Sequence, residues 1–249
     1  LHGPTFDIIP GNRAISRNST FRLRGVPMFF TPYFYKSLER LPRRSGLLTP
    51  NIGNSSRRGK MIGVGYYWAI NRSMDATYRA QWFTERGLAH HIDFRGKPVR
   101  GTDFNFILYG VNDRGELQKD GTRVKQGGFL LSFEGKSELP AGFQAFADIN
   151  YLSSFTFRQQ FTESFYEAIF SEAHSTGVVT RHWSSFGFNV VAQRDQIFFS
   201  TAPDDSINIR KLPEAQFISR QRQINRKVLP VWFSLWSSAG LEYRTQPQF

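Results

Sequence analysis

The sequence lacks cysteine and long apolar runs. None of its 249 residues is cysteine, which excludes disulfide scaffolds, cysteine zinc ligands and thiol nucleophiles. The longest uncharged run, residues 228–241, has 14 residues, whereas a membrane-spanning helix needs roughly 20. No charged and then apolar leader follows Leu1, so we expect any signal peptide to be missing already. The chain is therefore predicted not to be a helical membrane protein.

Acidic residues are scarce in the first quarter of the chain. Residues 1–60 contain eleven Lys and Arg but two acids, whereas residues 61–249 contain 21 bases and 18 acids. Arginine outnumbers lysine 24 to 8, which favours forked contacts to phosphate or carboxylate. A basic arm of this kind can bind nucleic acid. Because the bases alternate with aromatics and no zinc-finger, helix-turn-helix or RNP-type pattern occurs, we expect no nucleic acid partner.

Aromatic residues are abundant and closely interleaved with polar ones. They make up 16% of the chain, and the mean hydropathy is −0.41 although 40% of the residues are hydrophobic. From about residue 60 onward, segments of about ten residues alternate apolar and polar side chains between turn-forming clusters. The clearest are 75–84, 88–95, 103–109, 129–134 and 143–151. Their short connectors are typical of hairpins, so the pattern predicts an all-β, antiparallel meander.

Two architectures produce this alternation. In a soluble β-sandwich the apolar face packs into a core and the polar face meets water. In a transmembrane barrel the apolar face meets lipid and the polar face lines the lumen. Segments of about 9–11 residues match a tilted bilayer crossing, and aromatic residues gather at strand ends as interfacial girdles require. These features favour a transmembrane β-barrel, with the sandwich left open as an alternative.

The stretch 26–95 contains sequence motifs in addition to the alternation of apolar and polar residues. It contains, in order, Val-Pro-Met-Phe-Phe-Thr-Pro-Tyr at 26–33, Arg-Arg-Ser-Gly-Leu-Leu-Thr-Pro-Asn at 43–51, Gly-Tyr-Tyr-Trp-Ala-Ile-Asn at 65–71, Asp-Ala-Thr at 75–77 and Glu-Arg-Gly at 85–87. This stretch resembles the LPS-assembly outer-membrane protein family (LptD, the organic solvent tolerance protein). Residues 148–153 and 211–214 are similar to further family elements, although Ser154 stands where the family has an acid. The resemblance is dense over 26–95 and patchy over 96–249.

The resemblance implies a periplasmic N-terminal β-jellyroll followed by a large outer-membrane barrel. Residues 1–40 would be the end of the jellyroll and its link, and residues 41–249 the N-terminal portion of the barrel. We count about ten to twelve strand-like segments, too few for the family barrel, so we expect the chain to be a fragment. Its expected location is the outer membrane of a diderm bacterium, with the N-terminal residues in the periplasm.

The resemblance also implies a lateral gate near the first two barrel strands. The family has one proline in each of them, and proline weakens a sheet because it cannot donate a ladder hydrogen bond. Pro50 matches the first proline. Gly65 replaces the second, with Gly63 two residues earlier, and glycine weakens a strand by about 0.5–1 kcal/mol relative to alanine. We predict that Pro50, Gly63 and Gly65 form the gate. Alternatively, Pro50 only starts a strand and the glycines make room for ring packing.

Two basic pairs are candidates for lipopolysaccharide or phosphate contact. Arg43 and Arg44 stand where the jellyroll would meet the barrel, within reach of lipid phosphates. Alternatively, they cap a turn or mark the membrane edge. Arg57 and Arg58 fall in the first hairpin, where a basic tip meets either the anionic outer surface or solvent.

The remaining polar residues give no sign of catalysis. Asp93 and Arg95 share the face expected to line the lumen, with Arg79 expected nearby, and we predict a polar network that satisfies buried charge. His90 and His91 point to opposite strand faces, so they cannot form a two-histidine metal site. Because no nucleophile elbow or nucleotide-binding motif occurs, we expect no enzyme activity, cofactor or metal.

The expected function is lipopolysaccharide transport and assembly, with insertion into the outer leaflet through the lateral gate. The partners implied by the resemblance are lipopolysaccharide, an LptE-type lipoprotein plug, an LptA-type periplasmic bridge, the barrel-assembly machinery and outer-membrane lipid. Two alternatives remain. An outer-membrane porin or uptake channel would leave Pro50 and residues 1–40 without a purpose. A soluble carbohydrate-binding sandwich would bury Phe104, Phe106 and Phe129.

Overall fold

The structure is a computed structural model. It describes residues 5–10, 12–23, 25–38, 43–162, 170–201, 205–225 and 231–247. The chain divides into two units, Leu1–Arg44 and Ser45–Phe249. None of the helices in these described ranges is long and apolar enough to cross a membrane.

The N-terminal unit contains one antiparallel sheet in the order β1-β2-β3. Its strands are β1 (Thr5–Ile9), β2 (Arg13–Leu23) and β3 (Val26–Ser37). Large side chains of β3, among them Phe29 and Tyr33, are more than half exposed, and Ser16 and Ser19 of β2 are buried and hydrogen-bonded to each other. The unit therefore leaves an aromatic face uncovered among the residues that the structure describes.

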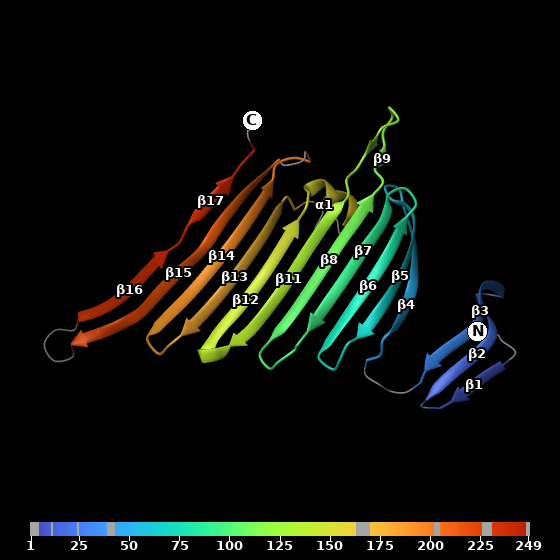
Figure 1. Cartoon of the computed structure of the whole chain (residues 1–249), viewed down its shortest axis with the longest axis horizontal. Coiled ribbons are helices and arrows are strands. Elements are labelled where there is room, and N and C mark those ends of the chain that lie inside the picture. The colour runs from blue at the N-terminus through green and yellow to red at the C-terminus, as the bar shows by residue number, and fades with distance from the viewer. Residues whose placement is uncertain are drawn as a thin grey trace. The chain divides into compact units, whose positions relative to one another are not determined.

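The second unit is built on one antiparallel sheet, whose strands lie side by side mostly in chain order (Figure 1). Its strands are β4 (Gly46–Ser55), β5 (Gly59–Ala69), β6 (Met74–Phe83), β7 (Gly87–Gly96), β8 (Asp103–Asp113), β11 (Gly128–Leu139), β12 (Phe143–Leu152), β13 (Glu172–His182), β14 (Phe186–Phe198), β15 (Ser206–Asn225), β16 (Val231–Ala239) and β17 (Glu242–Thr245). β4 lies at one edge, and both β16 and β17 pair with β15. The sheet is not closed, and the predicted all-β meander is confirmed as a partial barrel wall.

The two ends of this sheet differ. At one end, which we call the short-turn end, the described connections are brief, such as the 3₁₀ turn Pro140–Gly142 between β11 and β12. At the other, the long-loop end, the connection from β8 to β11 contains the hairpin β9 (Glu116–Leu117) and β10 (Arg123–Val124). The connection from β12 to β13 there contains the helix α1 (Phe155–Phe161). Long loops at one end and short turns at the other are typical of outer-membrane barrels.

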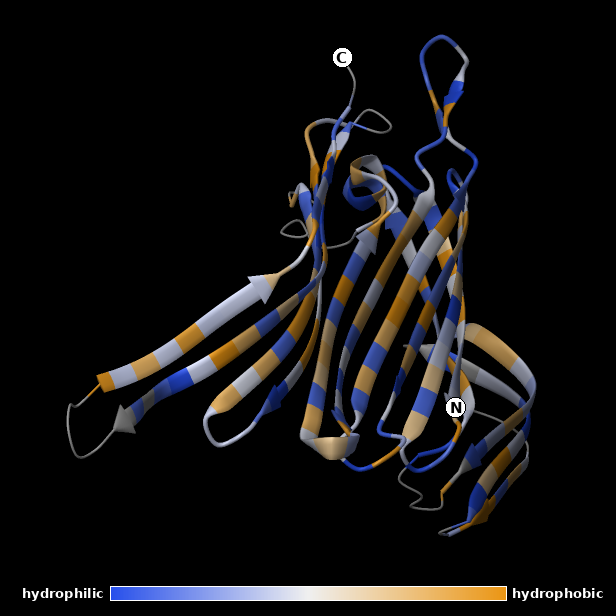
Figure 2. Ribbon diagram, turned by 60° about the vertical axis from the view of Figure 1, so that its left-hand side comes forward, coloured by the Kyte–Doolittle hydropathy of each residue, from blue (hydrophilic) through white to orange (hydrophobic). Residues whose placement is uncertain are grey.

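α1 distinguishes the two faces of the sheet. Phe157 and Phe161 of α1 are buried against Phe83, Ala89 and other residues of one face, which we call the inner face. Ser154 caps the helix, since its hydroxyl accepts a hydrogen bond from the Phe157 amide at 3.1 Å. Figure 2 shows the sheet curving around the side that carries α1, with hydropathy alternating along each strand. Most of the buried core therefore lies on the inner face beneath α1.

The outer face is apolar and uncovered. On β5, the side chains of Ile62, Val64, Tyr66 and Trp68 alternate with inner-face residues and are each about half exposed. Phe129 is 41% exposed, and Phe104 and Phe106 remain partly exposed. The sandwich alternative, which would bury these three rings, is therefore not favoured. The predicted strand faces of β7, β8, β11 and β12 agree with the observed register.

Candidate functional site

Pro50 lies at a bulge in the edge strand β4. Leu48 pairs with Gly65 and Asn51 with Gly63, so two residues, Thr49 and Pro50, lie opposite one residue of β5. Edges and bulges are the places where a sheet tolerates proline. Because β4 extends from Gly46 to Ser55, Pro50 is inside the strand, and the alternative that it merely starts the strand is wrong.

The bulge reverses the phase of β4. Leu47 and Ile52 are separated by an odd number of positions, which would ordinarily place them on opposite faces. Across the bulge both pair with outer-face residues of β5, and they are 84% and 81% exposed. The extra residue thus keeps large apolar side chains on the outer face at both ends of the strand.

Gly63 and Gly65 lie on the inner face of β5, one on each side of the bulge. A Cβ atom at Gly63 would be 2.9 Å from Cγ of Asn51, and a Cβ at Gly65 would be 3.0 Å from both Arg79 Cγ and Leu48 Cδ1. The glycines make room for these neighbouring side chains rather than for rings. The structure therefore brings the three predicted gate residues together at one place, which we call the seam.

A cavity of about 590 Å³ lies on the inner side of the seam. We call it the seam pocket. It is lined by Leu48, Thr49, Asn51, Val64, Gly65, Arg79, Gln81, His91, Tyr109, Leu130, Phe161 and Thr162. The pocket combines apolar side chains with one arginine and a histidine, and the His91 ring meets Tyr109 edge-on with centroids 6.0 Å apart. Such a lining is chemically suited to an amphipathic molecule that carries negative charge.

The structure places the predicted polar residues on the inner face but gives Arg95 another partner. Its Nε lies 2.8 Å from Oδ1 of Asp75, which is directly opposite on β6 and buried. Arg79 lines the seam pocket, and Oδ1 of Asp93 is buried without a hydrogen-bond partner. Sequence reasoning missed Asp75, although a hairpin turning at residues 84–86 places it opposite Arg95.

The two histidines lie as the alternation predicts. His90 is on the outer face, with Nδ1 2.6 Å from the Tyr78 hydroxyl, whereas His91 is on the inner face against Tyr109. Within the described residues there is no group of three or more potential metal ligands.

The basic pairs near β4 have different surroundings. Arg43 and Arg44 directly precede β4 and are exposed. Arg57, in the turn between β4 and β5, donates a hydrogen bond from Nη1 to the Gln159 carbonyl of α1 at 3.4 Å. The Arg58 guanidinium lies 5.2 Å above the Phe83 ring. The first hairpin is thus attached to the packing around α1.

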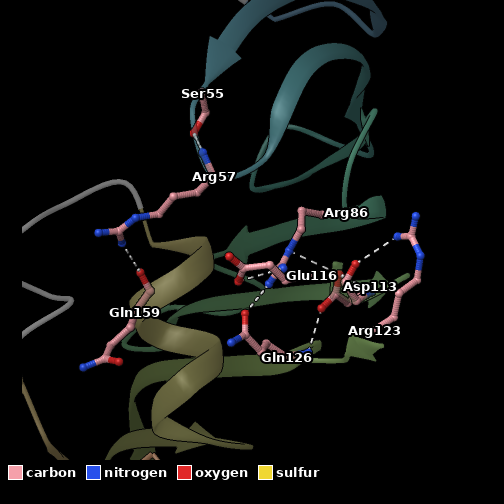
Figure 3. A network of polar contacts seen from close by, with 9 residues as sticks. Ser55, Arg57, Arg86, Asp113, Glu116, Arg123, Gln126 and Gln159 are labelled. Carbon is pink, nitrogen blue, oxygen red and sulfur yellow. Dashed lines mark hydrogen bonds and ion pairs between the residues drawn. The ribbon is translucent and has the colours of Figure 1, made fainter. Parts of the chain in front are cut away.

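A polar network around the buried Arg86 joins two connections at the long-loop end, the turn between β6 and β7 and the connection from β8 to β11 (Figure 3). Arg86 is 1% exposed. Its Nε lies 3.3 Å from Oδ1 of Asp113, and its Nη1 lies 3.4 Å from Oε2 of Glu116. Its Nη2 donates to the Gln126 side chain. We call Arg86, Asp113, Glu116 and Gln126 the loop clamp. Removing one partner of such a buried pair typically costs about 3–5 kcal/mol.

The loop clamp also supports α1. Asp113 accepts backbone hydrogen bonds from Gly115 at 3.0 Å and Gln126 at 2.7 Å, and the Arg86 guanidinium lies 5.4 Å from the Phe161 ring. Sequence reasoning met Arg86 only inside the motif at 85–87. Its partners come from an irregular connection, so neither periodicity nor spacing could identify them.

Comparison with known proteins identifies a family. A family model described as LptD protein matches residues 14–228. The LPS-assembly protein LptD of Alkalilimnicola ehrlichii is 29% identical over 193 residues, which are 78% of this chain and 24% of that protein. That of Pseudoalteromonas atlantica is 27% identical over 216 residues, 86% of this chain and 27% of the relative. That of Mannheimia succiniciproducens is 40% identical over 82 residues, 31% of this chain and 10% of the relative. The chain therefore spans about a quarter of the length of the first two relatives.

Proposed function

This chain belongs to the LptD family, and on that premise we propose that it takes part in lipopolysaccharide transport and assembly. In this proposal, residues 41–249 form the N-terminal part of an outer-membrane barrel wall in a diderm bacterium. The names of the relatives, LPS-assembly protein LptD, support the substrate. The barrel wall is supported by the exposed apolar outer face and by strands of 10 and 11 residues such as β4 and β5, which match a tilted bilayer crossing.

The observation that carries the proposal is the seam at the edge of the sheet. Proline and a bulge together interrupt the ladder between β4 and β5, and on either side of the bulge Gly63 and Gly65 provide no side chain to pack. In a closed barrel, β4 would meet the last strand of the longer protein. A first strand that β5 holds only loosely can move away from the last strand at a lower cost in free energy, so we propose that Pro50, Gly63 and Gly65 form the lateral gate.

The seam pocket could hold lipopolysaccharide on the inner side of this gate. A lipopolysaccharide molecule has acyl chains and phosphates, and the pocket offers Leu48 and Phe161 to the former and Arg79 to the latter. Passage between β4 and the closing strand would bring the molecule from this pocket to the apolar outer face. The predicted polar residues Asp93 and Arg95 then belong to the lumen wall that surrounds the pathway.

The remaining partners follow from the family. We propose that residues 1–40, the end of a periplasmic jellyroll and its link, meet an LptA-type bridge, and that an LptE-type lipoprotein occupies the inner side of the barrel. Assembly would require the barrel-assembly machinery, and outer-membrane lipid would cover the outer face. Arg43 and Arg44 are proposed to contact lipid phosphates near the periplasmic edge, and Arg57 and Arg58 near the outer surface.

Photo-crosslinking in the full-length protein tests the gate. A photo-reactive amino acid at Leu48, on the inner face of the seam, should crosslink to lipopolysaccharide in growing cells. The matched control is Ser132, which lies on the inner face of β11 away from the seam. The account requires a clear excess of lipopolysaccharide adduct at Leu48. Equal yields at both positions, or no adduct at Leu48, would contradict it and favour a pore without a lateral exit.

A further inference from the structure

Charge is divided between the faces of the large sheet. The register places each paired strand residue on one face, and the acidic residues all fall on the inner face: Asp75, Asp93, Asp103, Asp113, Glu134, Glu138, Asp148, Glu172, Asp195, Glu214 and Glu242. Among the described side chains at paired positions, the outer face carries Lys60, Arg181, Arg194 and Arg210 as its charged residues. The apolar outer wall therefore has positive charge and no paired-strand carboxylate to balance it.

Two of these bases are direct neighbours. Arg194 of β14 and Arg210 of β15 are opposite each other in the register, which separates their Cβ atoms by about 4.5–5.5 Å. Like charges in this position destabilise a sheet. Asp195, the nearest acid in sequence, points to the inner face and lies 2.9 Å from His174 Nδ1. No carboxylate of the described residues forms an ion pair with either arginine.

The surroundings of Arg194 orient it without neutralising it. Nη2 donates to the Gln196 Oε1 atom at 2.9 Å and to the Asn208 Oδ1 atom at 3.0 Å. The guanidinium carbon lies 4.9 Å over the Tyr151 ring, and Tyr151 in turn stacks on the outer-face ring of Phe129 at 5.3 Å. These neutral groups hold the guanidinium in place, and its remaining N–H groups stay available to an acceptor.

The pair lies where a lipid headgroup would be. β14 ends at Phe198 and β15 begins at Ser206, both at the long-loop end. On the outer face, Arg210 is also opposite Tyr243 of β17. Further along the same face of β14, Ala192, Val190 and Phe188 continue as an apolar strip. Arginine with aromatic neighbours above an apolar surface matches a molecule with a phosphate at one end and acyl chains at the other.

We propose that Arg194 and Arg210 form an outward-facing binding site for the phosphate of a lipid headgroup. Arginine recognises phosphate through forked hydrogen bonds, and one phosphate between the two guanidinium groups removes their mutual repulsion. The site lies on β14 and β15, on the opposite face from the seam pocket. The assignment to a lipid, rather than to free phosphate, rests on the proposed membrane location of the wall.

Equilibrium binding to the purified full-length protein tests the site. The probes are lipid A carrying two phosphates and the same lipid without phosphate, presented in detergent micelles and detected by native mass spectrometry. The double variant R194Q/R210Q should bind the phosphorylated lipid about tenfold or more weakly, the loss expected for charge-assisted hydrogen bonds. The dephosphorylated lipid should bind the variant and the unmodified protein equally.

Arg181 provides the matched control. It is on the same face, and its guanidinium lies over Phe143 at 5.1 Å and Trp183 at 4.6 Å, near the short-turn end. R181Q should leave binding unchanged. Heat-modifiable gel migration checks folding, and R194K/R210K, which keeps the charge but loses the fork, should show an intermediate loss.

Three results would overturn the proposal: unchanged affinity in R194Q/R210Q, an equal loss in R181Q, or displacement of the lipid by inorganic phosphate at millimolar concentration. The last result would identify a site for free phosphate instead. Because the assay measures binding without transport, its failure leaves the gate untouched, and the gate is tested separately at Leu48.

Discussion

The seam and the loop clamp lie in one sheet and are built in opposite ways. At the seam, a proline bulge lies between two positions that pair with glycines, and the neighbouring Leu47 and Ile52 are almost fully exposed. At the loop clamp, a fully buried arginine is paired with a fully buried aspartate and covered by α1. This wall therefore concentrates its rigidity at the long-loop end and leaves the first strand of the sheet weakly attached.

The largest effect is expected from the loop clamp. Arg86→Met leaves the Asp113 carboxylate buried without its cation, so the free energy of unfolding should fall by about 3–5 kcal/mol. Denaturant unfolding of the full-length protein in detergent measures this. Arg57→Met, which removes the exposed hydrogen bond to Gln159, is the control and should cost less than about 1 kcal/mol. Equal effects of the two changes would show that the clamp is not rigid.

A smaller effect is expected at the inner-face pair of β6 and β7. Asp75→Asn removes the charge that accepts from Arg95, and because Asp75 is buried while Arg95 is exposed, we expect a loss of about 1–3 kcal/mol. Lys97→Gln breaks an exposed pair with Asp103 and should change stability by about 0–1 kcal/mol. The same unfolding experiment compares the two variants. A larger loss of unfolding free energy in Lys97→Gln than in Asp75→Asn would contradict the expectation that the more buried ion pair contributes more.

Pro50→Ala is expected to change function more than stability. Alanine restores a backbone N–H to the edge strand, while the unfolding free energy should shift by no more than about 1 kcal/mol. The yield of lipopolysaccharide adduct at Leu48 should fall several-fold, because β4 can then pair more completely. Thr49→Ala, at the same bulge, restores no N–H and serves as the control. Unchanged export and crosslinking in Pro50→Ala would mean that the proline has no part in the gate.

The smallest effect concerns the tip of the β9–β10 hairpin. The Thr122 hydroxyl and, to a lesser degree, its amide donate to the Asp120 carboxylate and lower the pKa of Asp120. A lowered folded-state pKa stabilises the turn above the unfolded value, near pH 4, and the contribution is lost as the pH falls through the folded value. Amide exchange at Thr122 should therefore accelerate on acidification relative to Asp120→Asn. Identical pH profiles in the two proteins would contradict this.

Sequence reasoning reached the strands and their faces because alternation is a local signal. That Phe104 and Phe106 share one face of β8 follows from the two-residue period alone. The bulge was also visible in principle, since Leu47 and Ile52 break the period around Pro50. The partners of Arg95 and Arg86 could not be found in this way. Finding the partner of Arg95 requires the register of a hairpin, and finding the partners of Arg86 requires the path of an irregular loop.

The inner position of α1 could not be predicted for a related reason. The apolar side chains of Phe157 and Phe161 do not reveal which face of the sheet they pack against. That face is determined by the rings of Tyr109 and Phe83, which lie on strands distant in sequence. The seam pocket depends on the same contact, since Phe161 forms part of its lining. The sequence therefore singled out the residues that we propose as the gate, but not the pocket behind them.

Amide hydrogen exchange of the full-length protein in a lipid bilayer tests the central claim most directly, since it reports how easily each strand opens. The measurement compares Gly63, Val64 and Gly65 at the seam with Ala89 and His91 on β7, the strand that follows the clamped turn. The account predicts exchange at the seam at least about tenfold faster, equivalent to 1.4 kcal/mol of opening free energy. Equal protection at the two places would contradict a gate at the first strand.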